Sequence, residues 1–151
     1  MNPDKFEVFG KPLAEGFAKA GGGKGLANFD VAPYVNTALG DDLDACRKPI
    51  KAQLALYIGG MGARGKNFYN DLAKHLGYEA AAVKIQDLYL AGRRAEAEAA
   101  VPDALVDDIA LVGPKERIRD RFQVWKESVV GTMLVGAQQI EAIRLLAELN
   151  A

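Results

Sequence analysis

The sequence predicts a helix-rich α/β fold with about two strands and six to eight helices. Residues 29–39 and 129–135 are rich in the β-branched, aromatic and aliphatic side chains that suit a sheet. Each of these segments is followed by a stretch with the apolar spacing of a helix. Elsewhere the apolar residues recur every three to four positions, so helices fill most of the chain. So few strands among so many helices is unusual for an independent α/β domain.

The beginning of the chain predicts a helix, a strand and a second helix. Residues 3–20 have helical spacing, Pro3 suits a first helical turn, and the glycines at 21–25 end the helix. In the strand at 29–39, Pro33 limits where the backbone can pair. Asp41 is the expected N-cap of the next helix, which continues to residue 58.

The rest of the chain predicts a helical region, one strand and two longer helices. Residues 66–112 are expected to form short helices, and Pro114 with Glu116 marks a helix start. The strand at 129–135 precedes a closing helix over residues 138–149. The inward side chains that helical spacing predicts are Ile118, Phe122 and Trp125 in one helix, and Ile140, Ile143 and Leu146 in the other.

The bulk composition excludes several classes of partner. The chain has 151 residues, half of them hydrophobic, and we predict a single domain over residues 1–151. Its net charge of −1 provides no basic excess for nucleic acid. No apolar stretch reaches the roughly 20 residues of a membrane span, and the amino terminus lacks an apolar signal core. We therefore expect no nucleic-acid partner, no membrane partner and a cytoplasmic location.

The residue types needed for common catalytic and metal sites are scarce. Cys46 and His75 are the single cysteine and the single histidine, so no intrachain disulfide and no Cys/His metal site can form. Cys46 lies in an amphipathic pattern and is expected to be a small buried side chain. His75 falls near the end of a helix, where a surface or capping role is commoner. We predict no catalytic residue and no metal.

A glycine-rich loop at residues 59–65 admits two interpretations. Gly60-x-x-x-x-Gly65-Lys66 is nearly a phosphate-binding P-loop, but Asn67 stands where a P-loop has Ser or Thr, and no strand precedes it. The alternatives are a plain glycine turn between two helices and a small anion or ligand site at the start of the next helix. The candidate residues of that site are Gly59, Gly60, Gly62, Arg64, Lys66 and Asn67.

Several segments together resemble the C-terminal part of the luciferase-like monooxygenase family, of the F420-dependent oxidoreductase type. The resemblance follows the chain in order and covers nearly all of it. The segments are FDVAP at 29–33, LGDDLDACR at 39–47, ALYIGGMGARGKNFYNDL at 55–72, IQDLYLAG at 85–92, IALVGP at 109–114 and LLAEL at 145–149.

The resemblance implies part of a (β/α)8 barrel. Residues 29–39 would be the seventh strand and 129–135 the eighth, with a helical insertion at 59–112 between them. A complete barrel takes about 200 residues or more, so most of the cofactor-binding strands are missing. Active sites of such barrels lie at the carboxyl ends of the strands. The candidate residues at this mouth are Gly40, Asp41, Gly136 and Ala137.

Three functional hypotheses follow. The first is a truncated or stand-alone C-terminal fragment that is not catalytic alone, binds no cofactor alone, and forms a homo-oligomer, most simply a dimer, through its exposed strands. The second is a subunit that completes an F420- or FMN-dependent oxidoreductase with a chain supplying the N-terminal half. The third is a small anion-binding module that uses the loop at residues 59–66.

Overall fold

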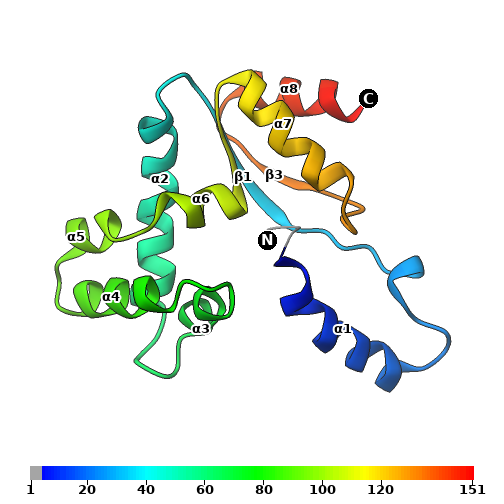
Figure 1. The fold of residues 1–151 in the computed structure, drawn as a ribbon, viewed down its shortest axis with the longest axis horizontal. Helices are drawn as coiled ribbons and strands as arrows, with labels where there is room; N and C mark the ends of the chain where they lie inside the picture. The colour runs from blue at the N-terminus through cyan, green and yellow to red at the C-terminus, as the bar shows by residue number, and fades with distance from the viewer. Residues whose placement is uncertain (1–4) are drawn as a thin grey trace. The chain divides into compact units, whose positions relative to one another are not determined.

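The computed structural model describes residues 5–151, which contain eight α-helices and three strands. Contacts divide the chain into two compact units. The sheet unit comprises Met1–Asp41 and Ile109–Ala151, and the helical unit comprises Asp42–Asp108. The elements are α1 (Glu7–Ala20), η2 (Leu26–Asn28), β1 (Tyr34–Leu39), α2 (Leu43–Ala55), η3 (Leu56–Gly60), α3 (Phe68–His75), α4 (Glu79–Leu90), α5 (Arg94–Ala99), α6 (Asp103–Ile109), β2 (Ala110–Gly113), α7 (Lys115–Lys126), β3 (Leu134–Gly136) and α8 (Ile140–Asn150) (Figure 1).

The helix-rich α/β prediction is confirmed, with one more strand than expected. All three strands are parallel, in the order β2-β1-β3, so β1 is paired along both of its edges. β2 falls in the region that the sequence predicted as helical. Its four residues are all buried, and such a short apolar stretch cannot be assigned to strand or helix by periodicity.

Both predicted strands are shorter in the structure than in the sequence analysis. β1 begins at Tyr34, after Pro33, which has no backbone N–H to give to a ladder. Upstream, Val31 pairs with Val130 in an isolated parallel bridge. Between this bridge and β3, Thr132 Oγ1 donates to Asp30 Oδ2 at 2.8 Å. Backbone bonds continue beside it, since the N–H groups of Gly131 and Leu134 donate to the Val31 and Pro33 carbonyl oxygens, so the two segments stay paired but with irregular geometry.

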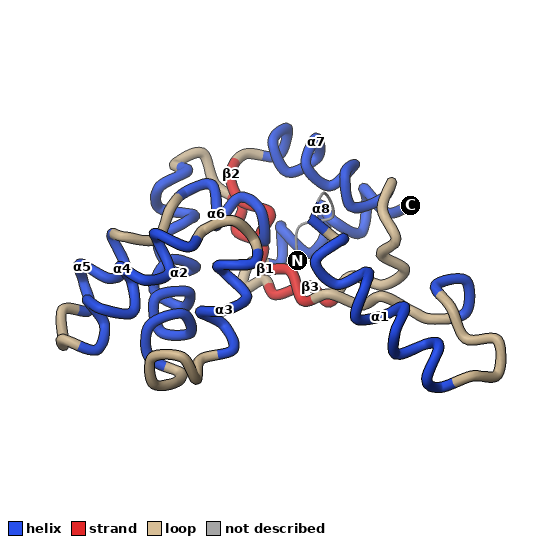
Figure 2. The backbone as a smooth tube through the Cα atoms, turned by 60° about the horizontal axis from the view of Figure 1, so that its bottom comes forward, coloured by secondary structure: helices blue, strands red, loops and turns tan. Residues whose placement is uncertain are grey.

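One face of the sheet carries the core of its unit. Val35 and Leu111 belong to one cluster with buried side chains of α7 and α8. These two helices lie beside the strands in Figure 2. The predicted inward residues of α7 are confirmed, because Ile118, Phe122 and Trp125 are all buried there.

The predicted inward face of α8 is largely wrong. Of the three expected residues only Leu146 is buried, while Ile140 is 61% exposed and Ile143 is 49% exposed. Ala142 and Leu145 are buried instead. The helix contains two apolar stripes at helical spacing, and spacing alone cannot say which one meets the sheet.

The opposite face of the sheet is open at its amino end. Tyr34 and Leu134 are neighbours in register and lie on the other side of the strands from Val35. They are 59% and 50% exposed. A Cβ atom at Gly136 would lie 2.2 Å from the Tyr34 hydroxyl oxygen, so this glycine gives the tyrosine its room.

The first helix, α1, follows the predicted pattern only in part. It ends where predicted, because Gly21, Gly22 and Gly23 all adopt positive φ angles. The predicted start at Pro3 lies outside the described residues. No side chain of α1 is buried.

The helical unit contains α2 to α5, η3 and most of α6, and Figure 1 shows α3, α4 and α5 following one another in green. Asp42, not the predicted Asp41, is the N-cap of α2, since its carboxylate accepts from the backbone N–H groups of Asp44 and Ala45. The predicted insertion at 59–112 overlaps this unit, which begins earlier. The single-domain prediction stays a prediction. Within the described residues, no helix has the length and apolar character needed to cross a bilayer.

Candidate functional site

The glycine-rich loop begins in a π-helical turn, η3, that directly continues α2. A P-loop needs a strand at this place, so the helix upstream excludes that motif. The glycines are needed for packing. A Cβ atom at Gly59 would lie 2.5 Å from Tyr89 Cβ, and one at Gly62 would lie 2.3 Å from the Lys66 carbonyl oxygen. Ordinary contacts are longer than these by about an ångström, so neither position has room for a side chain.

Asn67 holds the loop together from its centre. Its side chain is 2% exposed and makes four hydrogen bonds. Nδ2 donates to the carbonyl oxygens of Tyr57 and Ile58, both at 3.0 Å. Oδ1 accepts from the backbone N–H groups of Tyr69 and Asn70, which makes Asn67 the N-cap of α3. The residue that departs from the P-loop pattern is therefore a structural link between η3 and α3.

Asn70 adds a second link of the same kind. Its Nδ2 donates to the Ile58 and Ala82 carbonyl oxygens, at 3.1 and 2.8 Å. The Ile58 carbonyl oxygen in η3 thus accepts from both side-chain amides, and Asn70 also connects η3 to α4 through Ala82.

The charged residues of the loop do not converge on an open site. Arg64 pairs with Asp87 at 2.7 Å, so its charge is matched within the chain. Gln86 donates to the Gly62 carbonyl oxygen at 3.2 Å. The structure thus brings the six predicted loop residues together, but it uses them for packing and hydrogen bonding. An anion site here stays a prediction that these contacts do not favour.

The four predicted mouth residues lie toward the carboxyl ends of β1 and β3 but not level with one another, because Gly136 is in register with Asn36, four residues before Gly40. Because the strands are parallel, Gly40 and Asp41 after β1 lie toward the same end of the sheet as Gly136 and Ala137 at the end of β3. The backbone N–H of Gly40 donates to the Gly113 carbonyl oxygen at 3.1 Å, which places the end of β2 beside Gly40. These residues offer backbone groups and one carboxylate.

Gln139 organises this end of the sheet and was not predicted. Its side chain takes the place of a neighbouring strand, since Oε1 accepts from the Leu39 N–H at 2.8 Å and Nε2 donates to the Leu39 carbonyl oxygen at 2.7 Å. It thereby ties the start of α8 to the end of β1. The only signal in the sequence is an amide residue between a strand and a helix, which is too common to single out.

A cluster of charges joins α2 to α6 within the helical unit. Arg47, only 9% exposed, donates from Nε and Nη2 to the two carboxylate oxygens of Asp107, at 3.1 and 2.6 Å. Its Nη1 donates to Asp103 at 3.1 Å. Lys51 forms a further ion pair with Asp103. Hydrogen bonding to Lys51 and the nearby Arg47 hold the pKa of Asp103 below its usual range.

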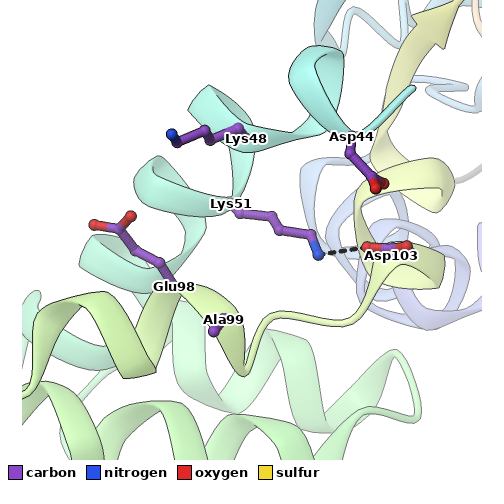
Figure 3. Close-up of a pocket in the computed structure, with 6 residues that line it drawn as sticks. All are labelled: Asp44, Lys48, Lys51, Glu98, Ala99 and Asp103. Carbon is purple, nitrogen blue, oxygen red and sulfur yellow. Dashed lines mark ion pairs between the residues drawn. The ribbon is translucent and has the colours of Figure 1, made fainter. Parts of the chain in front are cut away.

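A cavity of about 360 Å³ lies beside this cluster. Figure 3 shows Lys51 reaching from α2 to Asp103, while Lys48 and Glu98 extend away from that pair. Ligand pockets are mostly apolar, whereas Ala99 is the only apolar residue among the six that line this cavity. The cavity is better described as a charged surface hollow.

The pairing of Lys51 with Asp103 predicts a pH dependence. Because the folded pKa of Asp103 is lowered, its contribution to stability is present above the ordinary carboxyl pKa of about 3.9 and is lost as pH falls through the folded value. We expect Lys51→Met to lower the free energy of unfolding by about 0.5 kcal/mol at pH 7. Urea denaturation at pH 7 and pH 3 should show this difference shrinking in acid. Lys48→Met, on the same helix, is the matched control.

The single cysteine and the single histidine lie in α2 and α3. Cys46 is buried, as predicted. His75 Nδ1 lies 2.7 Å from the Asp71 carbonyl oxygen in the last turn of α3. Across the residues that the structure describes, no group of three or more His, Cys, Asp or Glu side chains is placed to hold a metal ion.

Most of the sequence matches a known family. The family model described as luciferase-like monooxygenase matches residues 1–132. The chain belongs to the luciferase-like monooxygenase family.

Two relatives extend this finding. A Mycobacterium tuberculosis protein with the provisional name coenzyme F420-dependent oxidoreductase is 35% identical over 148 residues, which is 98% of this chain and 43% of the relative. The coenzyme F420-dependent tetrahydromethanopterin reductase from Methanopyrus kandleri has a similar fold, with a TM-score of 0.68 and 22% identity. That match covers 97% of this chain and 41% of the reductase. The chain therefore spans less than half the length of either protein.

The residues of this chain do not by themselves fit F420 or a flavin. A planar ring of that size needs a pocket that encloses most of its surface. At the carboxyl ends of the strands, Asp41 is exposed and Gly40, Gly136 and Ala137 are half-buried. The mouth residues would contact only one side of the cofactor ring. Within residues 5–151, no other residues are placed to cover its other side.

Proposed function

We propose that this chain supplies the closing strands and the helical segment of an F420- or flavin-dependent oxidoreductase barrel, and that it is not catalytic alone. The observation that carries this proposal is the open sheet. Three parallel strands are covered by helices on one face, and their other face exposes Tyr34 and Leu134. Parallel sheets are normally buried on both faces, so this arrangement calls for further strands.

The order of the strands shows where strands of another chain could pair with this sheet. Since β1 is paired on both sides, the free edges belong to β2 and β3. We expect these edges to accept strands from a second copy, as a homo-oligomer, or from a chain that supplies the earlier strands. In a barrel completed in this way, Gly40, Asp41, Gly136 and Ala137 would form part of the rim around the cofactor.

The cofactor proposal is tested by titration. With F420 or FMN added to the isolated chain, we expect no saturable change in fluorescence up to about 100 μM cofactor, because the ring cannot be enclosed. A complete oxidoreductase of the family, measured in parallel, is the positive control. Micromolar binding to the isolated chain would show that the site is already complete.

One substitution on the open face of the sheet tests whether the chain associates through β3. Leu134→Lys is expected to weaken any association through β3 by about tenfold, because a charge enters the apolar contact. Light scattering coupled to size exclusion measures this. Leu90→Lys on α4, at a residue 46% exposed in the helical unit, is the control and should change nothing. If both variants associate like the natural chain, β3 is not the contact.

A further inference from the structure

The outer side of α8 carries an apolar stripe that the chain leaves uncovered. Ile140 is 61% exposed and Ile143 is 49% exposed, and Ala147, one turn further on, is also exposed. At about 100° per residue, this stripe lies roughly 140° around the helix from the buried face. α8 therefore presents one apolar face to the core and a second one to solvent.

One flank of this stripe carries three charges without a partner. Glu141, Arg144 and Glu148 are exposed and lie side by side at helical spacing. Within residues 5–151, none of the three takes part in an ion pair. The order along the flank is negative, positive, negative.

We propose that α8 is a self-association surface, which packs against α8 of a second copy in antiparallel orientation about a two-fold axis. In such a pair the same stripe meets itself, so Ile140 and Ile143 are covered on both copies. The same flank also meets itself, which brings Arg144 of each copy next to Glu141 or Glu148 of the other. The apolar stripe and the alternating charges of α8 are therefore complementary to those of a second, antiparallel α8.

Strands that complete the sheet would not cover this stripe. They pair at the edges of β2 and β3, whereas the stripe faces away from the side of α8 that packs on the core. In a completed (β/α)8 barrel a helix of the added half would lie beside α8 in the outer ring, so this inference concerns the chain on its own, as does its test. α8 has eleven residues, about 16 Å of helix, so the contact is smaller than a standard interface. We expect dissociation in the range of about 10–100 μM.

The apolar part of the contact is tested by sedimentation equilibrium between about 1 and 200 μM, a range that spans the expected dissociation constant. Replacing Ile140 and Ile143 together by Glu should abolish the α8-mediated step of association. The control replaces Val83 and Leu90 on α4, each 46% exposed, by Glu, and should associate like the natural chain. A natural chain that is monomeric throughout, or a variant at Ile140 and Ile143 that still associates at the same concentration, overturns the proposal.

Charge-reversal variants test the proposed contacts between Arg144 of one copy and Glu141 or Glu148 of the other. Arg144→Glu, and separately the double variant Glu141→Arg with Glu148→Arg, should each weaken self-association about tenfold. Mixing the two variants should restore a heterodimer, because opposite charges then face each other. Circular dichroism confirms that both are folded. If mixing restores nothing, the antiparallel geometry is wrong. Leu134→Lys, which acts on β3, should leave this contact unchanged and so separates it from the strand contact.

Discussion

Replacing Asn67 by alanine is expected to lower the free energy of unfolding of the helical unit by about 3 kcal/mol. The side chain is 2% exposed and makes four hydrogen bonds, so its loss leaves the Tyr57 and Ile58 carbonyl groups with one partner fewer in a buried place. It also removes the N-cap of α3, which contributes about 1 kcal/mol. Urea denaturation followed by circular dichroism measures the change.

Asn67→Ser separates the two contributions. Serine can still accept from the start of α3, but it is too short to donate to the carbonyl groups of η3. We expect it to recover about 1 kcal/mol of the loss. Asn150→Ala, at an exposed position in the last turn of α8, is the control for an asparagine with no such role. A cost below about 1 kcal/mol for Asn67→Ala would mean that water replaces the amide, and the link between η3 and α3 would not be structural.

The same loop shows what could be predicted from the sequence. The glycines, the helix on each side and the mismatch at Asn67 were all visible, and they correctly argued against a P-loop. The reason for the glycines was not visible. It lies in Tyr89, more than twenty residues away in the chain, whose ring packs where side chains of Gly59 and Gly60 would stand. Contacts of this kind depend on tertiary packing, which no local pattern records.

Two features of the sheet unit show the same limit. The pattern indicated the segments of β1 and β3, but β2 was taken as helical, because four apolar residues next to a helix have no period of their own. In α8 the spacing predicted Ile140 and Ile143 on the inner face, whereas the structure buries Ala142 and Leu145. The start of this helix is tied to β1 by the hydrogen bonds of Gln139 to Leu39, a tertiary contact that spacing does not record. The resemblance to a barrel family predicted the fold class, and neighbouring strands and side chains decided the details.

Replacing Arg47 by methionine is expected to lower the free energy of unfolding by about 3 kcal/mol at pH 7. The guanidinium is 9% exposed and bridges α2 to Asp103 and Asp107 of α6. Methionine preserves much of the apolar contact of the side chain but leaves the Asp107 carboxylate, which is 18% exposed, without its bidentate partner. Breaking one side of a buried pair costs about 3–5 kcal/mol, and the partial exposure of Asp107 favours the low end.

The pH dependence of the stability loss in Arg47→Met distinguishes lost charge pairing from lost packing. Asp103 has a lowered pKa, in part because of Arg47, so the stability that this pairing provides is present above about pH 4 and is lost as pH falls through the folded pKa. The difference between the natural chain and Arg47→Met should therefore shrink from pH 7 to pH 3, as measured by urea denaturation. Arg93→Met is the control, because Arg93 pairs with the exposed Glu96 and its loss should leave the free energy of unfolding nearly unchanged at both pH values. If the cost at Arg47 is the same at both pH values, lost packing explains it. The cluster would then align α2 with α6 by shape, with little contribution from charge.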